Sequence, residues 1–505
     1  MNDAFAIVAI LTVSLVTLAV GAFGLRISRT TSDFYVASRA ISPALNASAI
    51  SGEYLSAASF LGVAGLVLAR GADMLWYPVG WTAGYLILLV FVAAPLRRSR
   101  AYTLPDFAEF RVESVPARKV ASALVVLIGV LYLVPQFQGA GLTLRTLTGA
   151  PSWLGAVVVA LVVLVNVVSG GMRSITIVQA FQYWLKLVAL TFPLAFLLVH
   201  WRRDGRTTPG LHATDWIEPM QGHYAMYLTY SLILATFLGT MGLPHVVVRF
   251  YTNRDGRAAR RTTVAVLGML SVFYLLPPLY GVLGRVYTSD LIASGKTDSV
   301  VLELPGRLLG GSAGELLTAL LGAGAFAAFL STSSGLVVSV GGVIGQDLLG
   351  RWFDGVTAFR IAGAVGALVT LGLTLLSSGL AVAHAVELAF AVAASTFCPL
   401  LLLGIWWRGL TARGAIAGLV VGGGLSASAV LATMLGASPA GWFGAVLAQP
   451  ALCTVPIAFA TMIGGSLLTK GRLPAHLGQT MVRLHTPEDV ELDRGNYHPE
   501  GAVGG

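Results

Sequence analysis

The chain has 505 residues, of which 56% are hydrophobic and only 11% are charged. A soluble protein carries about 25% charged residues, so this composition excludes an ordinary soluble protein. Apolar segments of about 20 residues recur along the whole length, which predicts an all-α polytopic membrane protein rather than a β-barrel. The net charge of +9 lies mostly in short loops, where it indicates membrane topology rather than nucleic-acid binding.

Thirteen segments have the length and apolar character of a membrane-spanning helix. We expect them at 4–25, 43–69, 74–96, 119–147, 152–169, 175–200, 222–248, 262–287, 313–346, 356–377, 383–407, 411–435 and 441–468. The first residues lack the basic stretch of a signal peptide, so the first segment is expected to remain as a helix. Cys398 and Cys453 fall inside spans and indicate neither a disulfide framework nor a metal site.

An odd number of spans places the two termini on opposite sides of the membrane. With the N-terminus outside, 23 of the 32 Lys and Arg residues fall on the inner side and eight on the outer side. Basic residues favour the cytoplasmic side, so the sequence predicts a plasma-membrane protein with an outer N-terminus and a cytoplasmic C-terminus. The loop at 201–221 is the exception, because it holds three arginines outside.

The segment after the last span, 469–505, is polar, and we expect a disordered cytoplasmic tail there. The sequence contains no G-x-x-x-x-G-K-[ST] motif, so ATP is not expected to drive the protein directly. It also shows no kinase or sensor motif. These features predict a secondary transporter that is not an enzyme and uses no cofactor.

The second span is polar where a lipid-facing helix would be apolar. Residues 46–62 read N-A-S-A-I-S-G-E-Y-L-S-A-A-S-F-L-G and include Glu53, Tyr54 and four serines. A carboxylate at membrane depth costs roughly 3 kcal/mol or more unless it lines a cavity or binds a partner. Many secondary transporters bind substrate near the midplane, where two helices break. We expect span two to break around Ser51–Gly52.

Span seven offers a second broken helix. Its stretch T-F-L-G-T-M-G-L-P-H contains Gly239, Gly242 and Pro244, and proline removes a backbone donor. Spans two and seven are five apart, which predicts two inverted repeats; Gly-rich helix packing is the alternative. The expected organisation is an extra helix with a linker, two repeats, two C-terminal helices and a tail, at 1–42, 43–200, 201–407, 408–468 and 469–505.

Span nine contains a run of four hydroxyl residues, S-T-S-S, at 331–334. Na⁺ is satisfied by oxygen ligands, which hydroxyls and the carbonyls freed at a helix break supply. Ser331, Thr332 and the carbonyl of Ala328 would supply three ligands, and carbonyls of span two would supply the rest. The alternative is that these hydroxyls bond to carbonyls of their own helix.

Five stretches resemble the sodium:solute symporter family, and within it the cation/acetate permeases. They are D-F-Y-V-A-S-R (33–39), S-G-E-Y-L-S-A-A-S-F-L-G (51–62), Y-T-L-P-D-F-A (102–108), G-T-M-G-L-P-H-V-V-V-R-F (239–250) and the Ser-Thr pair of span nine. The resemblance covers nearly the whole chain and implies a LeuT-like core of two inverted five-helix repeats. It also implies one sodium site, which the family's motifs carry over to Ala47, Ile50, Ala328, Ser331 and Thr332.

Two further points concern the coupling ion that the resemblance implies. Some members have an Asp in a T-D-x-x-Q segment of span six, whereas this chain reads I-T-I-V-Q with Thr176 at the matching position. This departure argues against a second sodium site. Some acetate permeases lack the Ser/Thr pair, so its presence here favours Na⁺ over H⁺.

The substrate that the resemblance implies is a short-chain monocarboxylate such as acetate, propionate or pyruvate. Hydrogen-bond donors and the positive end of a broken helix would bind its carboxylate. The candidate substrate-binding residues are Ser51, Gly52, Glu53, Tyr54, Ser56, Gln136 and Thr240. Gln138 is a further candidate.

Several titratable residues lie within spans. Glu53 would repel an anion, so it is protonated, paired with a cation, or a structural charge held by a partner. Lys186 and Glu387 are expected to be paired or to snorkel rather than to bind substrate. His245 and His384 show no metal-ligand spacing, and His245 is expected to cap or gate the broken helix.

The sequence therefore predicts a Na⁺-coupled importer of a short-chain monocarboxylate. Two alternatives stay open. One is a proton-coupled carrier of the same fold, with the proton on Glu53 or His245, or a symporter of another solute. The other is a passive channel or a transporter-derived sensor. The expected partners are the solute, Na⁺ and lipid, without nucleic acid. The sequence determines neither the preferred solute nor the oligomeric state.

Overall fold

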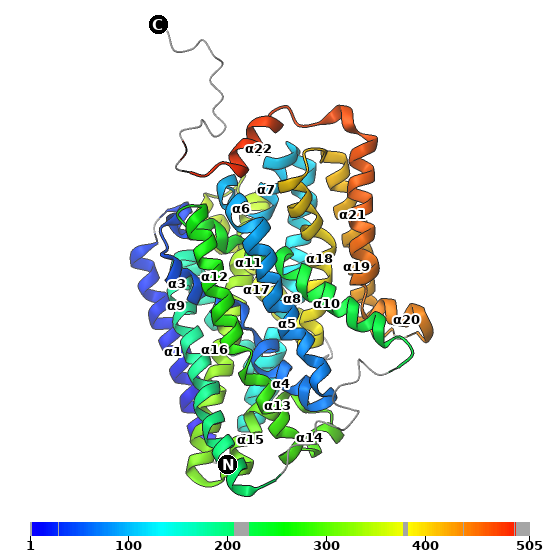
Figure 1. Ribbon diagram of the computed structural model, residues 1–505. Helices are drawn as coiled ribbons and strands as arrows, with labels where there is room; N and C mark the ends of the chain where they lie inside the picture. The colour runs from blue at the N-terminus through cyan, green and yellow to red at the C-terminus, as the bar shows by residue number, and fades with distance from the viewer. Residues whose placement is uncertain are drawn as a thin grey trace.

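The computed structural model describes residues 3–28, 30–206, 222–376, 382–437, 439–488 and 490 (Figure 1). These residues are helical apart from turns, short connections and one isolated β-bridge between Ile41 and Asn253, which confirms the all-α prediction. Most of the loop predicted at 201–221, and the end of the predicted tail from 491, lie outside the described residues.

The helices alternate between long spans and short connecting pieces. Up to residue 206 they are α1 (Asp3–Ile27), α2 (Thr31–Val36), α3 (Pro43–Tyr54), α4 (Val63–Arg70), α5 (Trp76–Ile87), α6 (Ala93–Ser99), α7 (Leu104–Val112), α8 (Val115–Thr148) and α9 (Ser152–Asp204). After residue 221 they are α10 (Ala225–Gly242), α11 (Pro244–Val248), α12 (Gly256–Phe273), α13 (Leu276–Tyr287), α14 (Asp290–Ala293), α15 (Val300–Leu309), α16 (Gly311–Ile344), α17 (Gly355–Leu376), α18 (Val382–Trp406), α19 (Ala412–Met434), α20 (Gly441–Ala448), α21 (Ala451–Leu468) and α22 (Leu477–His485).

The number of spans agrees with the prediction once two special helices are considered. In the described residues, eleven helices or continuous helix pairs are long and apolar enough to cross a membrane. A bent pair, Pro43–Tyr54 with Ala58–Arg70, forms one more span. Helix α9 has 53 residues, which at about 1.5 Å per residue is roughly 80 Å and too long for one crossing. Counting α9 as two spans gives the thirteen predicted.

Helix α9 turns back on itself at Gly171. The backbone there has φ 53° and ψ −150°, a conformation that glycine adopts without strain. Ser169 and Ser174, on either side of this turn, both donate to the carbonyl of Gly21 at 3.2 Å. Both halves of α9 therefore reach the same point on α1, and they correspond to the predicted fifth and sixth spans.

The first broken helix lies between α3 and α4, whose arms are bent by 68°. Helix α3 continues to Tyr54, because the amide of Leu55 still bonds to the carbonyl of Ser51 at 3.1 Å. Leu55 then leaves helical geometry, with φ −75° and ψ 82°. The break predicted at Ser51–Gly52 is therefore wrong by about one turn. Gly52 instead lets α3 pack against the backbone of α9.

The second broken helix lies where the sequence predicts it. Helix α10 ends at Gly242, Leu243 is extended with φ −70° and ψ 118°, and Pro244 begins α11. Proline fits the first turn of a helix because an amide there has no partner within the helix. The division into two inverted repeats around these breaks stays a prediction.

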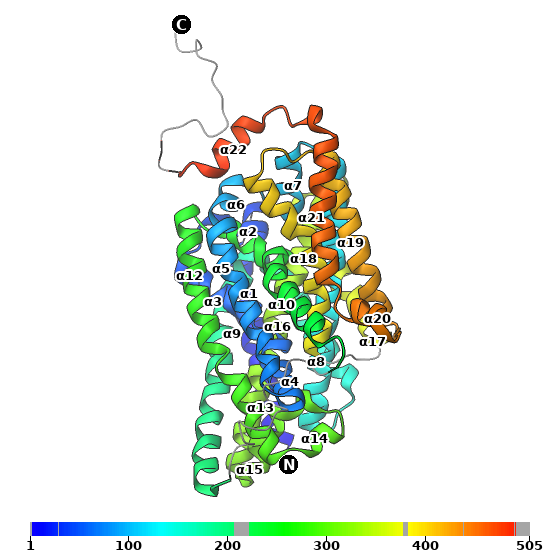
Figure 2. The ribbon, with the colours of Figure 1, turned by 45° about the vertical axis from the view of Figure 1, so that its right-hand side comes forward.

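Helix α16 lies inside the bundle and packs against α8, α9, α1 and α17 (Figure 2). Its hydroxyl run at 331–334 is buried. Glycine and alanine dominate the same helix, and small residues let neighbouring backbones approach closely. Helix α3 packs against both α9 and α16. Helix α9 also contributes Gln179 and Lys186, which bond to Ser331, so spans two, six and nine meet in the interior of the molecule.

The beginning of the predicted tail is ordered, which corrects the expectation of disorder from Thr469. Helix α22 packs against α6 and buries Met481 and Leu484. The guanidinium of Arg98 donates to the carbonyls of Leu484 and His485 at 3.3 and 3.2 Å. These carbonyls lie at the end of α22, where a helix leaves its last acceptors free, so Arg98 caps the helix.

Segments predicted to lie on the inner side gather at one end of the molecule. Arg97 donates to the carbonyl of Arg254, and Arg39 to that of Arg100, both at 2.6 Å. Helix α22 lies at this end, and α1 begins at the opposite end (Figure 1). This arrangement agrees with termini on opposite sides of a membrane. Which end faces the cytoplasm stays a prediction.

Cysteine labelling tests that orientation. In intact cells Arg254→Cys is expected to react only with membrane-permeant maleimides, and Gly205→Cys also with impermeant ones. Both positions are exposed, and the excess of basic residues places position 254 inside. Labelling is read on a gel, with lysed cells as the control in which both variants react. The reverse pattern would overturn the N-out assignment.

Candidate functional site

The candidate site surrounds the end of α3. A helix that stops leaves its last carbonyls without partners inside the helix. Here the carbonyls of Gly52, Glu53 and Leu55 find partners on α9 and α16 instead. All three residues are buried, so the polar groups that face them are shielded from solvent.

The hydroxyl pair of α16 faces these carbonyls. Ser331 Oγ lies 2.7 Å from the carbonyl oxygen of Gly52 and 3.0 Å from that of Ala328, and its hydroxyl can donate to either oxygen. Thr332 Oγ1 donates to the Glu53 carbonyl at 2.5 Å. The hydroxyls thus lie at the junction of spans two and nine rather than bonding only to their own helix.

Two members of the implied sodium set lie elsewhere on α3. Ala47 and Ile50 are buried, but they precede the end of the helix by one to two turns. The carbonyls that accept hydrogen bonds from the hydroxyl pair are those of Gly52 and Glu53. The direct contacts between α3 and α16 are therefore shifted toward the break relative to the family's pattern.

Lys186 enters this junction from α9. Its Nζ donates to the Gly52 carbonyl, and to the Leu55 carbonyl and Ser331 Oγ at 2.8 Å each. The side chain is completely buried. Lys186 therefore has partners, as expected. It does not snorkel to the membrane surface, because it lies inside the candidate sodium site.

Glu53 is held by Arg249. Arg249 Nε lies 2.5 Å from Glu53 Oε2, and neither side chain is more than 2% exposed. The guanidinium also donates to Thr176 Oγ1 at 2.8 Å and to Gln179 Oε1. Gln179 Nε2 in turn donates to the Ser331 carbonyl at 2.7 Å. The network ties α3, α9, α16 and the segment after α11 together, and Glu53 is a carboxylate paired with a cation.

Arg249 lies elsewhere than predicted. The prediction that span seven ends at residue 248 puts Arg249 in an inner loop, and this placement is wrong. The short helix α11 after the break carries it into the interior instead. The sequence contained a signal, because a carboxylate at membrane depth requires a cationic partner and Arg249 follows the broken segment directly.

The substrate-binding candidates separate into two groups. Tyr54 and Thr240 meet, with 2.8 Å between their hydroxyl oxygens, and Gln136 Oε1 accepts from the Ala57 amide at 3.0 Å. These side chains lie beside the break. Ser51 points toward α12, where its Oγ is 3.6 Å from Met269 Sδ. Ser56 lies at the break, whereas Gly52 lies within α3 and contacts α9.

Aromatic residues that the sequence analysis did not select complete this region. Phe390 on α18 is the common neighbour of Tyr54, Trp81 and Tyr132, with ring centroids 6.3, 5.8 and 5.9 Å away. Tyr85 stacks edge-to-face on Tyr54 at 4.9 Å. These tyrosines and this tryptophan are buried in the interior. The missed signal is their position in the middle of the predicted spans, because such residues are enriched at the membrane surface.

Several polar atoms in this region have no hydrogen-bond partner within the described residues. They include Trp81 Nε1, Tyr85 Oη, Gln136 Nε2 and both ring nitrogens of His245, together with Ser56 Oγ and Glu53 Oε1 at the end of α3. His245 therefore caps no helix; its ring stacks on Tyr132 at 5.1 Å. An unpaired buried donor costs about 1–3 kcal/mol, so a cluster of them indicates a place where a polar ligand or water binds.

Glu387 and His384 of span eleven precede Phe390 on α18, and Tyr77, which bonds to Glu387, stacks edge-to-face on Trp81 with ring centroids 5.5 Å apart. Glu387 Oε2 accepts from the Tyr77 hydroxyl and lies 3.4 Å from His384 Nδ1. Glu387 is thus partnered, as expected, and His384 has a carboxylate rather than a metal beside it. In the described residues no group of three or more His, Cys, Asp or Glu side chains is arranged to hold a metal ion.

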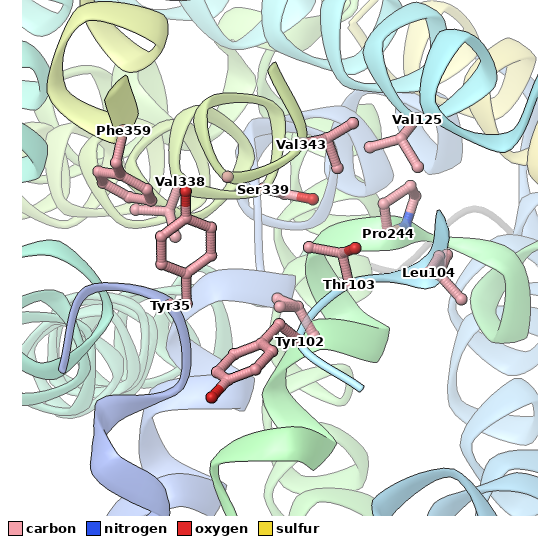
Figure 3. Close-up of a pocket in the computed structure, with 12 residues that line it drawn as sticks. Tyr35, Tyr102, Thr103, Leu104, Val125, Pro244, Val338, Ser339, Val343 and Phe359 are labelled. Atoms are coloured by element: carbon pink, nitrogen blue, oxygen red, sulfur yellow. The ribbon is translucent and has the colours of Figure 1, made fainter. Parts of the chain in front are cut away.

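A small cavity lies between the second broken helix and the end that holds α22. Pro244 of α11, Val338 and Ser339 of α16, and Tyr35 and Tyr102 line it (Figure 3). Its volume is ≈ 10 Å³, about enough for one water molecule. This space is too small to hold a carboxylate.

An ion-pair cluster stands beside the same cavity. Arg118 bonds to Asp106, Glu109 and Asp347 at 2.9, 2.7 and 2.6 Å. Asp106 also accepts from Gln346 Nε2 at 3.0 Å. The cluster joins α7 and the start of α8 to the end of α16, so it holds this end of the molecule together.

The bundle, its two broken helices and the buried polar junction define the class of protein: a LeuT-like membrane transporter rather than an enzyme. Residues 34–422 match the model of the sodium:solute symporter family. The chain belongs to the sodium:solute symporter family.

Two relatives cover nearly the full chain. An uncharacterized symporter, YwcA, of Bacillus subtilis is 30% identical over 94% of this chain and 97% of its own length. A monocarboxylic acid transporter of Corynebacterium glutamicum is 32% identical over 88% of each chain.

Solved structures confirm the fold. A Na⁺-coupled sialic acid symporter superimposes with a TM-score of 0.71 at 15% identity, over 92% of this chain and 97% of its own. Mhp1, a nucleobase-cation-symport-1 transporter, gives 0.58 at 14% identity, over 90% and 99%. MhsT gives 0.52 at 17% identity, over 84% and 98%. Identities this low show the shared fold alone.

Proposed function

We propose that this protein is a secondary active importer that couples the entry of Na⁺ to uptake of a short-chain monocarboxylate such as acetate, propionate or pyruvate. The similarity to a monocarboxylic acid transporter over most of both chains supports the substrate class. Family membership supports coupling to a cation.

The observation that carries the substrate proposal is the group of unpaired donors beside the break of α3. Among the described residues, Trp81 Nε1 and Gln136 Nε2 are donors without acceptors, and Tyr85 Oη can also donate. A carboxylate offers two oxygens that accept several hydrogen bonds. The surrounding rings of Tyr54, Tyr132 and Phe390 would pack against a short alkyl chain. Glu53 does not repel the substrate strongly, because Arg249 neutralises its charge.

The observation that supports Na⁺ is the set of oxygens between α3 and α16. We assign the ion to Ala47, Ile50, Ala328, Ser331 and Thr332, following the family's pattern. Hydroxyls and carbonyls are suitable ligands for a hard cation. Thr176, the position that differs from some relatives, accepts a hydrogen bond from Arg249. This supports a single sodium site.

Uptake into proteoliposomes tests the proposal. An inward Na⁺ gradient is expected to drive accumulation of radiolabelled acetate, with protein-free liposomes as the control. Propionate and pyruvate are expected to compete with acetate. Accumulation driven by a proton gradient in the absence of Na⁺ would replace Na⁺ by H⁺ as the coupling ion. Absence of uptake for all three solutes would overturn the substrate class.

Removing either hydroxyl tests the sodium assignment. Ser331→Ala and Thr332→Ala are each expected to raise the Na⁺ concentration for half-maximal uptake by roughly tenfold to a hundredfold, since losing one partner of a charged group costs about 1.5–3 kcal/mol. Ser333→Ala is the matched control, because the neighbouring Ser333 Oγ has no hydrogen-bond partner within the described residues. Unchanged Na⁺ dependence in both test variants would move the site elsewhere.

A further inference from the structure

The sodium junction proposed above already contains a positive charge supplied by the chain itself. Nζ of Lys186 bonds to the Gly52 and Leu55 carbonyls and to Ser331 Oγ. An ammonium group has three N–H donors, and each of them meets an acceptor. None of these acceptors is a carboxylate, so the ammonium sits in a cage of neutral oxygens, as a bound metal cation would.

Na⁺ and this ammonium share one proposed ligand, the hydroxyl of Ser331. Ser331 Oγ is a proposed sodium ligand, and it lies 2.8 Å from Lys186 Nζ and 2.7 Å from the Gly52 carbonyl. An ion bound to Ser331 would therefore lie next to Nζ. Two like charges this close repel each other strongly in a buried site, where water does not screen them.

The acidic residue at this junction is already paired with another cation. Glu53 Oε2 is bonded to Arg249, whose guanidinium also holds Thr176 and Gln179. With Lys186 in place, the two cationic side chains already outnumber the one carboxylate. A sodium ion added to this arrangement would raise the excess of positive charge further. The junction therefore holds one cation in addition to Arg249, and in this conformation that cation is Lys186.

We propose that Lys186 is a tethered cation that fills the sodium position when Na⁺ is absent, and that Na⁺ and the Lys186 side chain exclude each other. This inference rests on the sodium site of the proposed function. Entry of Na⁺ requires Lys186 to leave Gly52 and Leu55. Because Lys186 belongs to α9 and both carbonyls lie at the break of span two, its departure loosens α9 from the broken helix.

Lys186→Met and Lys186→Gln test the inference in purified full-length protein. Met keeps the length of the side chain without charge, and Gln keeps a hydrogen-bond donor. Thermal unfolding is followed during titration with NaCl, with choline chloride holding the ionic strength constant. Both variants are expected to bind Na⁺ about tenfold or more tightly than the native protein, since the competing occupant is gone. Lys296→Met, at an exposed lysine, is the matched control.

The outcomes separate clearly. Folded Lys186 variants with the native response to Na⁺, or with no response, would overturn the inference. Variants that fold only in the presence of Na⁺ would support it, because Na⁺ then replaces the ammonium. Failure to recover either variant even in Na⁺ would show that no such replacement occurs and would also overturn it. The readout needs no substrate, so a failure of monocarboxylate uptake would refute the substrate assignment and leave this result standing.

Discussion

Arg249→Met is expected to be inactive in uptake and to lose roughly 3–5 kcal/mol of stability. The substitution removes the partner of a carboxylate that is 2% exposed, and burying an unpaired charge is far more costly than losing an exposed ion pair. It also leaves Thr176 and Gln179 without their shared donor. Since Gln179 continues the network to Ser331, the damage reaches the proposed sodium junction.

A double-mutant cycle measures this pair. Glu53→Gln alone removes the negative charge but keeps a hydrogen-bonding amide, so it should be milder than Arg249→Met. Combining both changes should recover part of the stability, because no unpaired charge is left buried. Thermal stability in detergent and acetate uptake are the two measurements, with Arg254→Met, at an exposed arginine, as the control. A double variant whose losses simply add would show that the ion pair is unimportant. Normal Na⁺-driven uptake by Glu53→Gln would remove that carboxylate from the mechanism.

Gly52→Leu is expected to abolish uptake of every solute. A Cβ at this position would overlap the carbonyl oxygen of Gln179 and lie 3.4 Å from Tyr183 Cβ. The neighbour is backbone, which cannot rotate away, so α3 must move off α9. That movement breaks the contacts of Lys186 with the end of α3. Even Gly52→Ala should lose activity, because the clash begins with the first side-chain carbon.

The size of the effect at Gly52 distinguishes packing from helix propensity. Replacing glycine by alanine within a helix contributes about 0.5–1 kcal/mol of stability when space is free. Overpacking costs typically about 1–3 kcal/mol. At Gly52 this cost is larger than the stability gained from the helix propensity of alanine. Gly268→Ala in α12 is the control, since no described atom beyond its own helix lies within 4 Å of an added Cβ. It should be as stable as the native protein or more so. Full acetate uptake by Gly52→Ala would contradict the expectation.

The sequence predicted those features that depend on local composition. Pro244 and its neighbouring glycines marked the second break, and the hydroxyl run marked the face of α16 that meets α3. Each signal lies within a single segment of the chain, so it can be recognised without knowledge of long-range packing. The first break was predicted about one turn too early, because Gly52 was taken as a flexible position where the helix breaks. In the structure Gly52 allows the close contact between α3 and α9.

The partners of the site could not be predicted in the same way. Lys186 reaches the junction because α9 reverses at Gly171 and returns alongside α1 and α3. Arg249 reaches Glu53 across 196 positions of sequence. The spacing of apolar residues indicates which segments are helices, but it does not indicate which faces of distant helices meet. The unpaired donors of Trp81 and Tyr85 were missed for the same reason.

The complete burial of the candidate site limits how fast the protein can work. Lys186, Thr240 and His245 are inaccessible to solvent, and the cavity toward α22 has room for about one water molecule. A solute therefore cannot diffuse through this conformation. Each molecule must wait for helices to separate on one side and close again, motions that take microseconds to milliseconds. The flux through one copy is then set by the frequency of these motions, and it saturates with solute concentration, unlike the flux through an open pore.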